Sequence, residues 1–179
     1  ENALFIIGTG KILNIPNEVI AQFLKTTKAL EHRLENFFLK KNTLFVNDSK
    51  GTNVESTIKA IEAFKNKIIL IAGGENKKIC NDELIKKINE RVGFVYLIGE
   101  TGAILAEEME KIGYKKYKNL GTLEKVLVDI KENLDFEDSQ TILFSPATAS
   151  FDQFKNFEER GKIFKELTNK ILRENQIER

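Results

Sequence analysis

The residues best suited to phosphate and sugar chemistry gather in one short segment, Asn47 to Asn53, with the sequence NDSKGTN. It combines a carboxylate, hydroxyls, an ammonium group and a glycine directly before a helical pattern, and Asp48 can accept a hydrogen bond from a ribose hydroxyl. Thr52 with Glu55 fits a capping box, so the simplest role for Thr52 is a helix N-cap, which contributes about 1 kcal/mol. The sequence offers Asp48 and Lys50 no comparable local role.

A second candidate loop runs from Gly73 to Lys78 (GGENKK) and follows the apolar run KIILIA. Its paired glycines permit a tight turn and leave cations at the rim. An ordinary solvated turn with surface lysines explains the same residues, and the sequence alone leaves both interpretations open.

A third candidate segment, Thr141 to Gly161, reads TILFSPATASFDQFKNFEERG. Its small and hydroxyl-bearing residues let the backbone approach a ligand. Ser150 with Gln153 fits a capping box, so we expect a helix to begin at Ser150, with an N-terminus that favours an anion. Phenylalanines then recur every third residue to Phe157, which predicts one helical face. A strand, a turn and a capped core helix without a ligand fit equally well.

Four segments together resemble the Mur ligase family, in its D-glutamate-adding branch. SPATASFDQFKNFEERG closely resembles the signature near the family's C-terminus, and the match is long and nearly unbroken. NDSKGTN resembles the motif that begins the C-terminal domain, AGGENK resembles its next loop, and the segment from His32 to Glu35 resembles the hinge before that domain. The resemblance covers essentially the whole chain. Gly51 stands where alanine is more usual, a departure that should leave the site chemistry intact.

The resemblance implies roles for individual residues. Contacts with ATP are expected from Asn2 at the adenine, Arg33 at the phosphates and Asp48 at the ribose. Only the second asparagine of the family's HNxxN motif, at Asn2, falls within the chain. Lys50 is expected beside the reacting groups. The only histidine, His32, is assigned to the same catalytic set. We expect His32 to position the linker rather than to transfer protons.

The implied substrates are D-glutamate, ATP and UDP-N-acetylmuramoyl-L-alanine, the last bound mainly by other domains. In the family, ATP and Mg²⁺ activate a carboxylate as an acyl phosphate, which an amine then attacks. D-glutamate brings two carboxylates, so its site needs cations and hydrogen-bond donors. The residues expected to hold it are Thr52, Lys77, Ser150 and Phe157; Lys77 is preferred to Lys78 because it matches the family spacing.

No metal ligand is assigned within this chain, since the resemblance implies that the phosphate-binding loop and the Mg²⁺ ligands lie upstream. The segment from Gly8 to Lys11 resembles part of such a loop. However, Phe5 stands where the first glycine is required, and Ile12 stands where Ser or Thr would bind Mg²⁺. We therefore give this segment no functional weight.

The elements that must position these residues alternate between apolar strands and amphipathic helices. This pattern predicts an α/β fold, a Rossmann-like and mostly parallel six-stranded sheet with helices on both faces. In such a sheet the three candidate loops would open at the same edge, where ligands bind. The predicted strands are residues 37–39, 43–46, 67–72, 94–98, 114–117 and 141–144, the fifth being weak, and the predicted helices are 54–64, 82–91, 101–112, 122–133 and 158–172.

Two further helices, at residues 2–13 and 17–30, precede the sheet and are too short to bury a core of their own. We assign residues 1–31 to the end of a central ATP-binding domain with its linker, and residues 32–179 to the C-terminal domain. The first residue is not Met, so we expect a fragment that alone has no ligase activity.

Composition narrows the remaining possibilities. The 28 basic and 27 acidic residues nearly cancel, which argues against a nucleic-acid partner. The chain has no signal-peptide pattern and no apolar stretch of about 18 residues, and its single cysteine suits a reducing compartment. We expect a cytoplasmic monomer.

The alternative is an autonomous Rossmann-like module that binds a nucleotide or a small acid. Other branches of the family are disfavoured because their motifs DYAHxP and DGAHNP do not occur.

Overall fold

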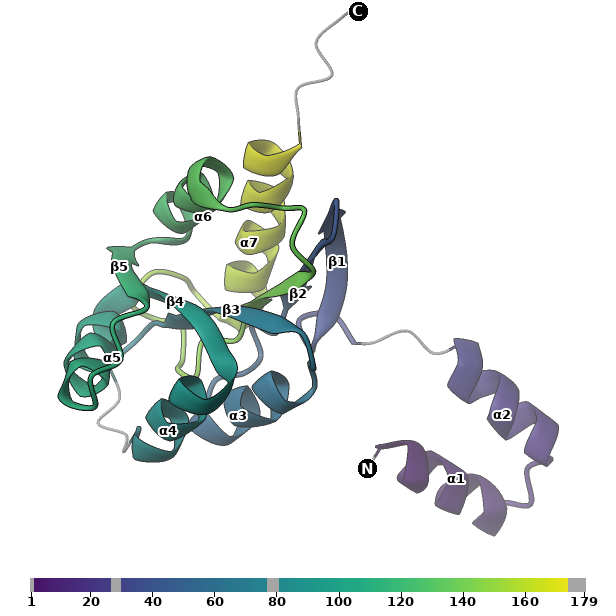
Figure 1. Ribbon diagram of the computed structural model, residues 1–179. Helices are drawn as coiled ribbons and strands as arrows, with labels where there is room; N and C mark the ends of the chain where they lie inside the picture. The colour runs from purple at the N-terminus through teal and green to yellow at the C-terminus, as the bar shows by residue number, and fades with distance from the viewer. Residues whose placement is uncertain (1, 27–29, 77–80, 174–179) are drawn as a thin grey trace, which may run out of the picture. The chain divides into compact units, whose positions relative to one another are not determined.

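The computed structural model describes residues 2–26, 30–76 and 81–173 (Figure 1). It divides into two compact units, Glu1–Leu30 and Glu31–Arg179. The assignment of the first unit to a central ATP-binding domain remains a prediction.

The first unit consists of two short helices, α1 (Asn2–Ile12) and α2 (Asn17–Thr26). They pack where Ile20 meets Gly10, at which a Cβ atom would come within 2.6 Å of the Ile20 side chain. Ile20 is the buried large apolar residue of this unit among the residues that the structure describes. Most of the other apolar side chains are exposed, among them Leu4, Phe5, Ile12, Leu13, Val19 and Phe23.

The second unit is built on a six-stranded sheet with the order β1-β2-β6-β3-β4-β5. Only β1 and β2 pair antiparallel, as a hairpin, and every other neighbouring pair is parallel. The fold class predicted from the sequence is therefore confirmed. The strands are β1 (Glu35–Lys40), β2 (Thr43–Asn47), β3 (Lys67–Gly73), β4 (Val92–Ile98), β5 (Tyr117–Gly121) and β6 (Gln140–Phe144).

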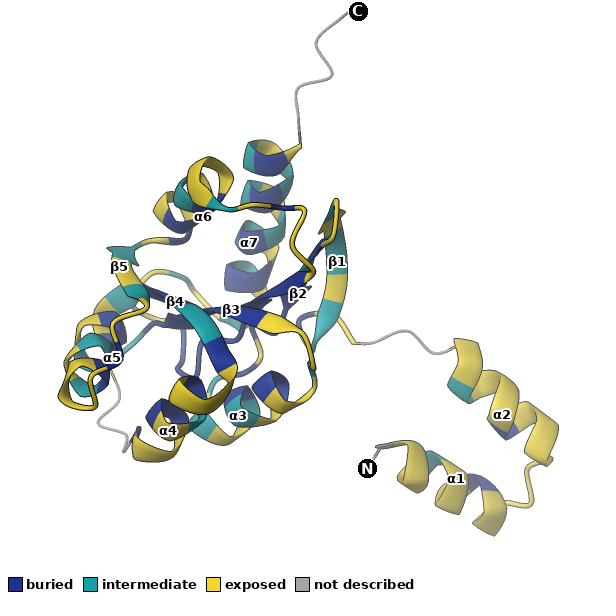
Figure 2. Cartoon of the chain, in the orientation of Figure 1, coloured by how far each residue is buried: buried dark blue, intermediate teal, exposed yellow. Residues whose placement is uncertain are grey.

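Helices cover both faces of this sheet (Figure 1). The helices α3 (Val54–Glu62), α4 (Asp82–Arg91) and α5 (Gly99–Lys111) lie on one face, and α6 (Leu123–Asn133) and α7 (Phe157–Leu172) lie on the other. Alternate strand residues point to opposite faces, so Leu70 belongs to the first core and Ile71 to the second. In Figure 2 β3 is dark blue beyond its first residue, because the central strands β3 and β6 are buried on both sides.

The predicted strand at residues 114–117 is wrong, because β5 begins only at Tyr117. Tyr114 is apolar in the sequence pattern because it is a core residue, not because it belongs to a strand. Its ring is buried in the core beneath α5, and its hydroxyl donates to the carbonyl of Val92 at 3.0 Å. The true strand is an edge strand with Lys118 and Asn119 exposed, so it lacks the continuous apolar run by which the other strands were found.

Both predicted capping boxes are also wrong. Residues 150–156 form turns, and α7 begins at Phe157 with Asn156 as its N-cap, whose Oδ1 accepts from the Glu159 amide at 2.8 Å. Likewise the N-cap of α3 is Asn53, whose Oδ1 accepts from the Ser56 amide at 2.8 Å. In each case an asparagine further along the chain caps the helix, in place of Ser150 and Thr52. The phenylalanines from 151 to 157 do not form a helical face.

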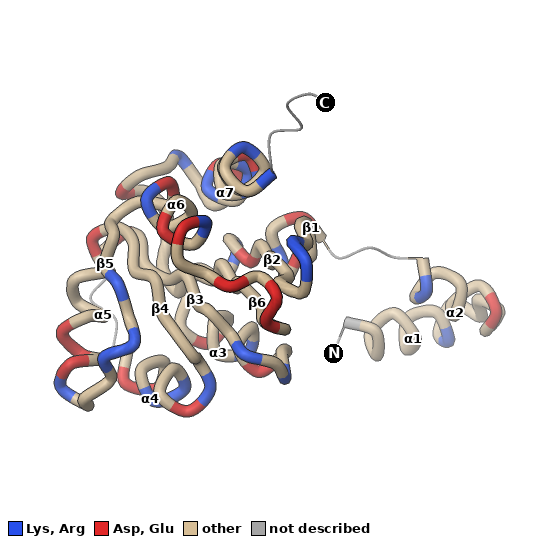
Figure 3. Tube along the Cα trace, turned by 45° about the horizontal axis from the view of Figure 1, so that its top comes forward, with Lys and Arg blue, Asp and Glu red and all other residues tan. Residues whose placement is uncertain are grey.

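The loops that follow β2, β3 and β6 meet at one edge of the sheet, as predicted. Ala147 donates its amide to the carbonyl of Gly51 at 2.8 Å, and Gly73 donates to that of Pro146, also at 2.8 Å. Segments almost a hundred residues apart in the chain are thus held together by backbone hydrogen bonds. In Figure 3 basic and acidic residues are interspersed along the elements of this unit.

Candidate functional site

Three of the predicted site residues line one cavity of about 280 Å³. Arg33 comes from the turn before β1, and Asp48 and Lys50 come from the loop after β2. The helix α3 also lines the cavity, through Ser56 and Lys59. The cavity therefore has three cations and one carboxylate on its walls, a composition that suits an anionic ligand.

The Asp48 carboxylate is buried and hydrogen-bonded within the protein. It is 7% exposed; its Oδ1 accepts from the Leu34 amide at 3.1 Å and its Oδ2 accepts from the Ser145 hydroxyl at 2.7 Å. Burial raises the pKa of this carboxyl, and the hydrogen bonds and the charge of Arg33 only partly oppose the rise. The carboxylate thus binds both Leu34 and Ser145 while it still borders the cavity.

Gly51 is packed more tightly than the resemblance led us to expect. A Cβ atom at this position would lie 2.6 Å from both the Asp48 Oδ2 and the Ser145 hydroxyl. Here, the glycine leaves room for that hydrogen bond.

Lys50 and Phe157 lie against each other. The Lys50 ammonium is 4.7 Å from the centre of the Phe157 ring, a cation–π contact. The same ring meets the His32 ring edge-on, with centroids 6.1 Å apart. Phe157 is held in turn by Ser49, whose hydroxyl donates to the Phe157 carbonyl at 2.8 Å. The aromatic ring predicted to contact D-glutamate is thus in direct contact with the ammonium predicted to lie beside the reacting groups.

The turn before β1 has an unusual backbone. His32 has φ 63° and Leu34 has φ 43°, the left-handed region that residues other than glycine rarely adopt. The amide of Lys50 donates to the His32 carbonyl at 3.1 Å. The turn that presents Arg33 is therefore joined directly to the loop that presents Lys50.

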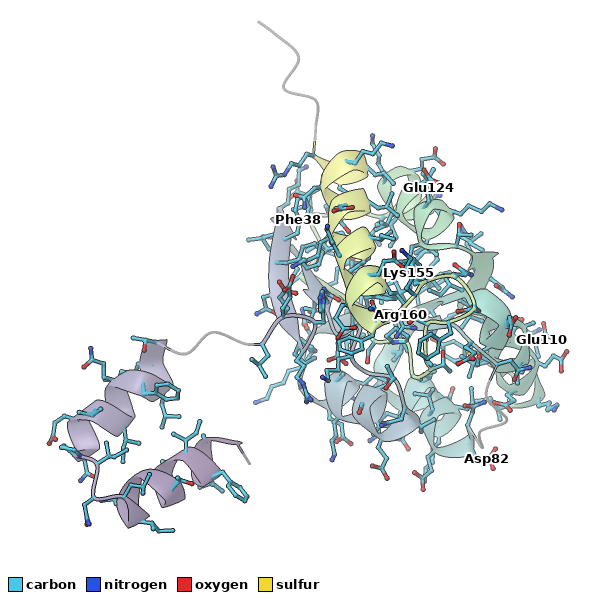
Figure 4. All side chains as sticks on the ribbon, turned by 180° about the vertical axis from the view of Figure 1, so that it is seen from behind. Phe38, Asp82, Glu110, Glu124, Lys155 and Arg160 are labelled. Atoms are coloured by element: carbon cyan, nitrogen blue, oxygen red, sulfur yellow. The ribbon has the colours of Figure 1, made fainter. Side chains whose placement is uncertain are left out.

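Arg160 is a fully buried arginine that the sequence analysis missed (Figure 4). Its guanidinium donates to three carbonyl oxygens, those of Ser49, Thr148 and Ala149, at 2.8 to 3.0 Å, and to the Ser49 hydroxyl at 3.1 Å. Burial lowers its pKa to about 10, so it remains charged at neutral pH. Arg160 thereby joins the loops after β2 and β6. Its helical spacing to Phe164, which points inward, was the signal that could have identified it.

The remaining predicted site residues either do not line this cavity or have side chains that the structure does not describe. Ser150 is buried at the start of the turn before α7, and Thr52 is half-buried beside Gly51. Lys77 lies outside the described residues, and so does Lys78. Asn2 is the first residue of α1, but its side chain is not described. The structure thus brings Arg33, Asp48, Lys50 and Phe157 together and leaves the other assignments as predictions.

Lys59 and Ser56 were not predicted as site residues, although both line the cavity. A lysine three residues after a serine on a helix is common, so their sequence carried no specific signal. Only the fold places this face of α3 in the same cavity as Arg33.

A cluster of Glu31, His32 and Glu35 has ligand atoms close enough to hold a metal ion. In the structure, however, the Lys165 ammonium binds both carboxylates, at 2.7 Å from Glu31 and 2.8 Å from Glu35. Burial lowers the pKa of Lys165, but the hydrogen bonds and charges of Glu31 and Glu35 together raise it above its ordinary value. The cluster is therefore an ion-pair network, and we do not assign a metal to it.

None of the described helices is long and apolar enough to span a lipid bilayer.

Comparison with known proteins identifies relatives along the whole chain. The family model of the Mur ligase glutamate ligase domain matches residues 32–148, more than half of the chain. The UDP-N-acetylmuramoylalanine–D-glutamate ligase of Fusobacterium nucleatum is 44% identical over 174 residues, which is 96% of this chain and 40% of the relative. The ligase of the same name from Caldicellulosiruptor bescii is 40% identical over 96% of this chain and 37% of the relative. The chain thus spans about two fifths of the length of the curated relatives it matches.

Solved structures share the fold at lower identity. The MurF ligase of Thermotoga maritima, crystallised with ADP, has a TM-score of 0.51 at 19% identity, over 82% of this chain and 32% of that one. The bifunctional folylpolyglutamate synthase/dihydrofolate synthase of Yersinia pestis has a TM-score of 0.59 at 16% identity, over 85% of this chain and 34% of that one. At these identities the likeness establishes the fold alone.

Proposed function

The chain belongs to the Mur ligase family through the glutamate ligase domain at residues 32–148, and from this premise we propose that it is the C-terminal part of an ATP-dependent ligase. The ligase adds D-glutamate to UDP-N-acetylmuramoyl-L-alanine in the cytoplasm, for peptidoglycan precursor synthesis. Relatives with a matching name over 96% of the chain support the choice of substrate. The cavity with three cations and one carboxylate is the observation that carries the role of this unit.

The chemistry requires that a carboxylate become reactive toward an amine. The γ-phosphoryl group of ATP passes to the carboxylate of UDP-N-acetylmuramoyl-L-alanine, which gives an acyl phosphate and ADP. The neutral amine of D-glutamate then attacks the carbonyl carbon, loses a proton and displaces inorganic phosphate. Cations beside the phosphoryl group stabilise the charge that moves in both steps.

The cavity supplies groups that fit the ribose and the phosphates of ATP. Asp48 fits a ribose hydroxyl because an acidic side chain can accept from a sugar, while Arg33 and Lys59 fit phosphate oxygens. Lys50 borders the cavity and contacts Phe157, and this position supports our proposal that its ammonium lies beside the phosphoryl group and D-glutamate. Thr52, Lys77 and Ser150 remain our proposed partners for the two carboxylates of D-glutamate.

The cavity does not by itself fit Mg²⁺. Its one carboxylate, Asp48, already accepts hydrogen bonds on both oxygens, whereas Mg²⁺ is usually held by carboxylates together with substrate phosphates. We therefore place the metal ligands outside the chain, and we assign no step to the metal here.

Synthesis of the amide by the longer protein is the direct test. We expect ATP-dependent transfer of labelled D-glutamate to UDP-N-acetylmuramoyl-L-alanine, and no phosphate release from the 179-residue chain alone. An autonomous module, the alternative, would instead bind a nucleotide or a small acid tightly as the isolated chain. Micromolar binding by the chain alone without ligation by the longer protein would favour that alternative.

The cavity can be tested residue by residue. In the longer protein, Arg33→Gln and Lys59→Gln should each raise the KM for ATP about tenfold, since a charged hydrogen bond is worth roughly 1.5–3 kcal/mol. The KM for D-glutamate should change much less. Lys65→Gln is the matched control, because Lys65 is an exposed lysine just after α3 and outside the cavity. Equal effects at Lys59 and Lys65 would remove Lys59 from the site, and no effect at Arg33 would contradict the assignment of the cavity to ATP.

A further inference from the structure

Asn47, the last residue of β2, is fully buried and binds four partners. Its Oδ1 accepts from the Ser49 amide at 3.2 Å. Its Nδ2 lies 2.9 Å from the Nδ1 of His32, 3.1 Å from the Oε2 of Glu35 and 3.3 Å from the carbonyl oxygen of Gly161. One side-chain amide thus connects the turn before β1, the strand β1 and the first turns of α7.

These contacts define the tautomer of His32. The Ser49 amide can only donate, so it must face the oxygen of Asn47. The NH₂ group of Asn47 therefore faces His32, and two further acceptors on that side agree with this orientation. The His32 Nδ1 must then accept, so its proton is on Nε2, which lies 3.8 Å from the Glu31 carboxylate. The uncharged His32 ring thus has the Nε2–H tautomer.

The backbone of His32 supports the site. Its amide donates to the Glu35 carboxylate at 3.1 Å, and its carbonyl accepts from Lys50 at 3.1 Å. Its ring packs against the first turns of α7, edge-on to Phe157 and so close to Gly161 that a Cβ atom there would overlap Nδ1. Because the turn is left-handed at His32, it needs such contacts to persist.

We propose that Asn47 is a positioning residue of the site. It fixes the Nε2–H tautomer of His32, and through His32 it fixes the turn that presents Arg33 and the backbone of Lys50. The effect on ligation rests on the proposed function, whereas the effect on the imidazole does not. His32 accordingly positions its neighbours and does not transfer protons.

The single histidine makes the imidazole part directly measurable. The ¹⁵N NMR spectrum of the 179-residue chain at pH 8 should show Nδ1 without a proton and Nε2 with one. In Asn47→Asp a carboxylate oxygen faces Nδ1, so the proton should be found on Nδ1. A protonated Nδ1 in the unchanged chain would overturn the proposal. The first measurement decides even if the variant does not fold.

The positioning part is measured in the longer protein. Asn47→Ala should lower kcat about tenfold, and His32→Ala should lower it no further in the Asn47→Ala background, because both act on one turn. Asn36→Ala, an exposed asparagine on β1, is the control and should keep the original rate. Additive losses would show that Asn47 does not act through His32. Absence of ligation by the unchanged protein would refute the proposed function and leave the NMR result valid.

Discussion

Asp48 is a buried carboxylate that borders the candidate site, and its burial lowers the stability of the folded chain. Its carboxylate is almost completely buried and has hydrogen-bond donors on both oxygens but no ion-pair partner in direct contact among the described residues. Burial raises its pKa in the folded chain, whereas the unfolded chain keeps an ordinary value of about 3.9. The folded chain therefore binds the proton more tightly. The unfolding free energy falls as the pH rises through the interval between the two values.

Asp48→Asn should consequently stabilise the 179-residue chain at pH 7. The amide keeps the shape, its oxygen can accept from Leu34, and its nitrogen can donate to Ser145. We expect the melting temperature to rise by about 2–4 °C, as for about 1 kcal/mol in a domain of this size. The difference should vanish below about pH 3.9, where both side chains are neutral. In the longer protein the same variant should use ATP less well. A lower melting temperature at pH 7 would show that the hydrogen bonds of the carboxylate outweigh the cost of burying it.

At the scale of elements, the strands could be predicted where both of their faces are buried. β3 and β6 are continuous apolar runs because helices cover both sides of the sheet there. β5 was misplaced because an edge strand has no such run. The helix start expected at Ser150 was wrong, because the segment offers two caps and only packing decides between Ser150 and Asn156, whereas the helix predicted at residues 158–172 agrees with α7 to within one residue.

The candidate site, like the strands, could be predicted only in part from the sequence. Residues next to a strong strand, such as Asp48 and Lys50, were placed correctly at the sheet edge because parallel strands end together. Lys59 and Asn47 were not identified, since their roles depend on which helix face or side chain lies opposite them in the folded chain. Spacing along the sequence does not contain that information.

Arg160 provides a test of how two loops are held to α7. Arg160→Met keeps an elongated side chain but leaves the buried carbonyl oxygens of Ser49 and Thr148 without their donor, whereas the Ala149 carbonyl still accepts from the Glu75 amide at 3.0 Å. Because unpaired buried groups cost roughly 1–3 kcal/mol each and part of this can be recovered by water, we expect a loss of about 3–5 kcal/mol in the free energy of unfolding by urea. Lys162→Met, at an exposed position of the same helix, should change the unfolding free energy by less than about 0.5 kcal/mol. If Arg160→Met were neutral, apolar packing would replace the guanidinium, and the loops would not depend on it.

At the scale of the whole molecule, the two units differ in how much they can bury. The second has two cores on either side of a six-stranded sheet. The first has two helices of 11 and 10 residues, with most of its large apolar side chains exposed. Helices of that length are marginal in water unless an apolar face is packed. The same exposed face is what a segment of a larger domain would show once separated from it.

Hydrogen exchange on the 179-residue chain should therefore separate the two units. Amides of α1 and α2 should exchange within seconds to minutes at neutral pH, since local opening of a nearly coreless helix pair costs little free energy. Amides of β3, β4 and β6 should exchange only through global unfolding, because their side chains are buried on both faces of the sheet. Destabilising the second unit with Arg160→Met should speed exchange in these strands and leave α1 and α2 unchanged. Slow exchange in α1 that accelerates in this variant would instead show that the first unit owes its order to the second, and the division into two independent units would be wrong.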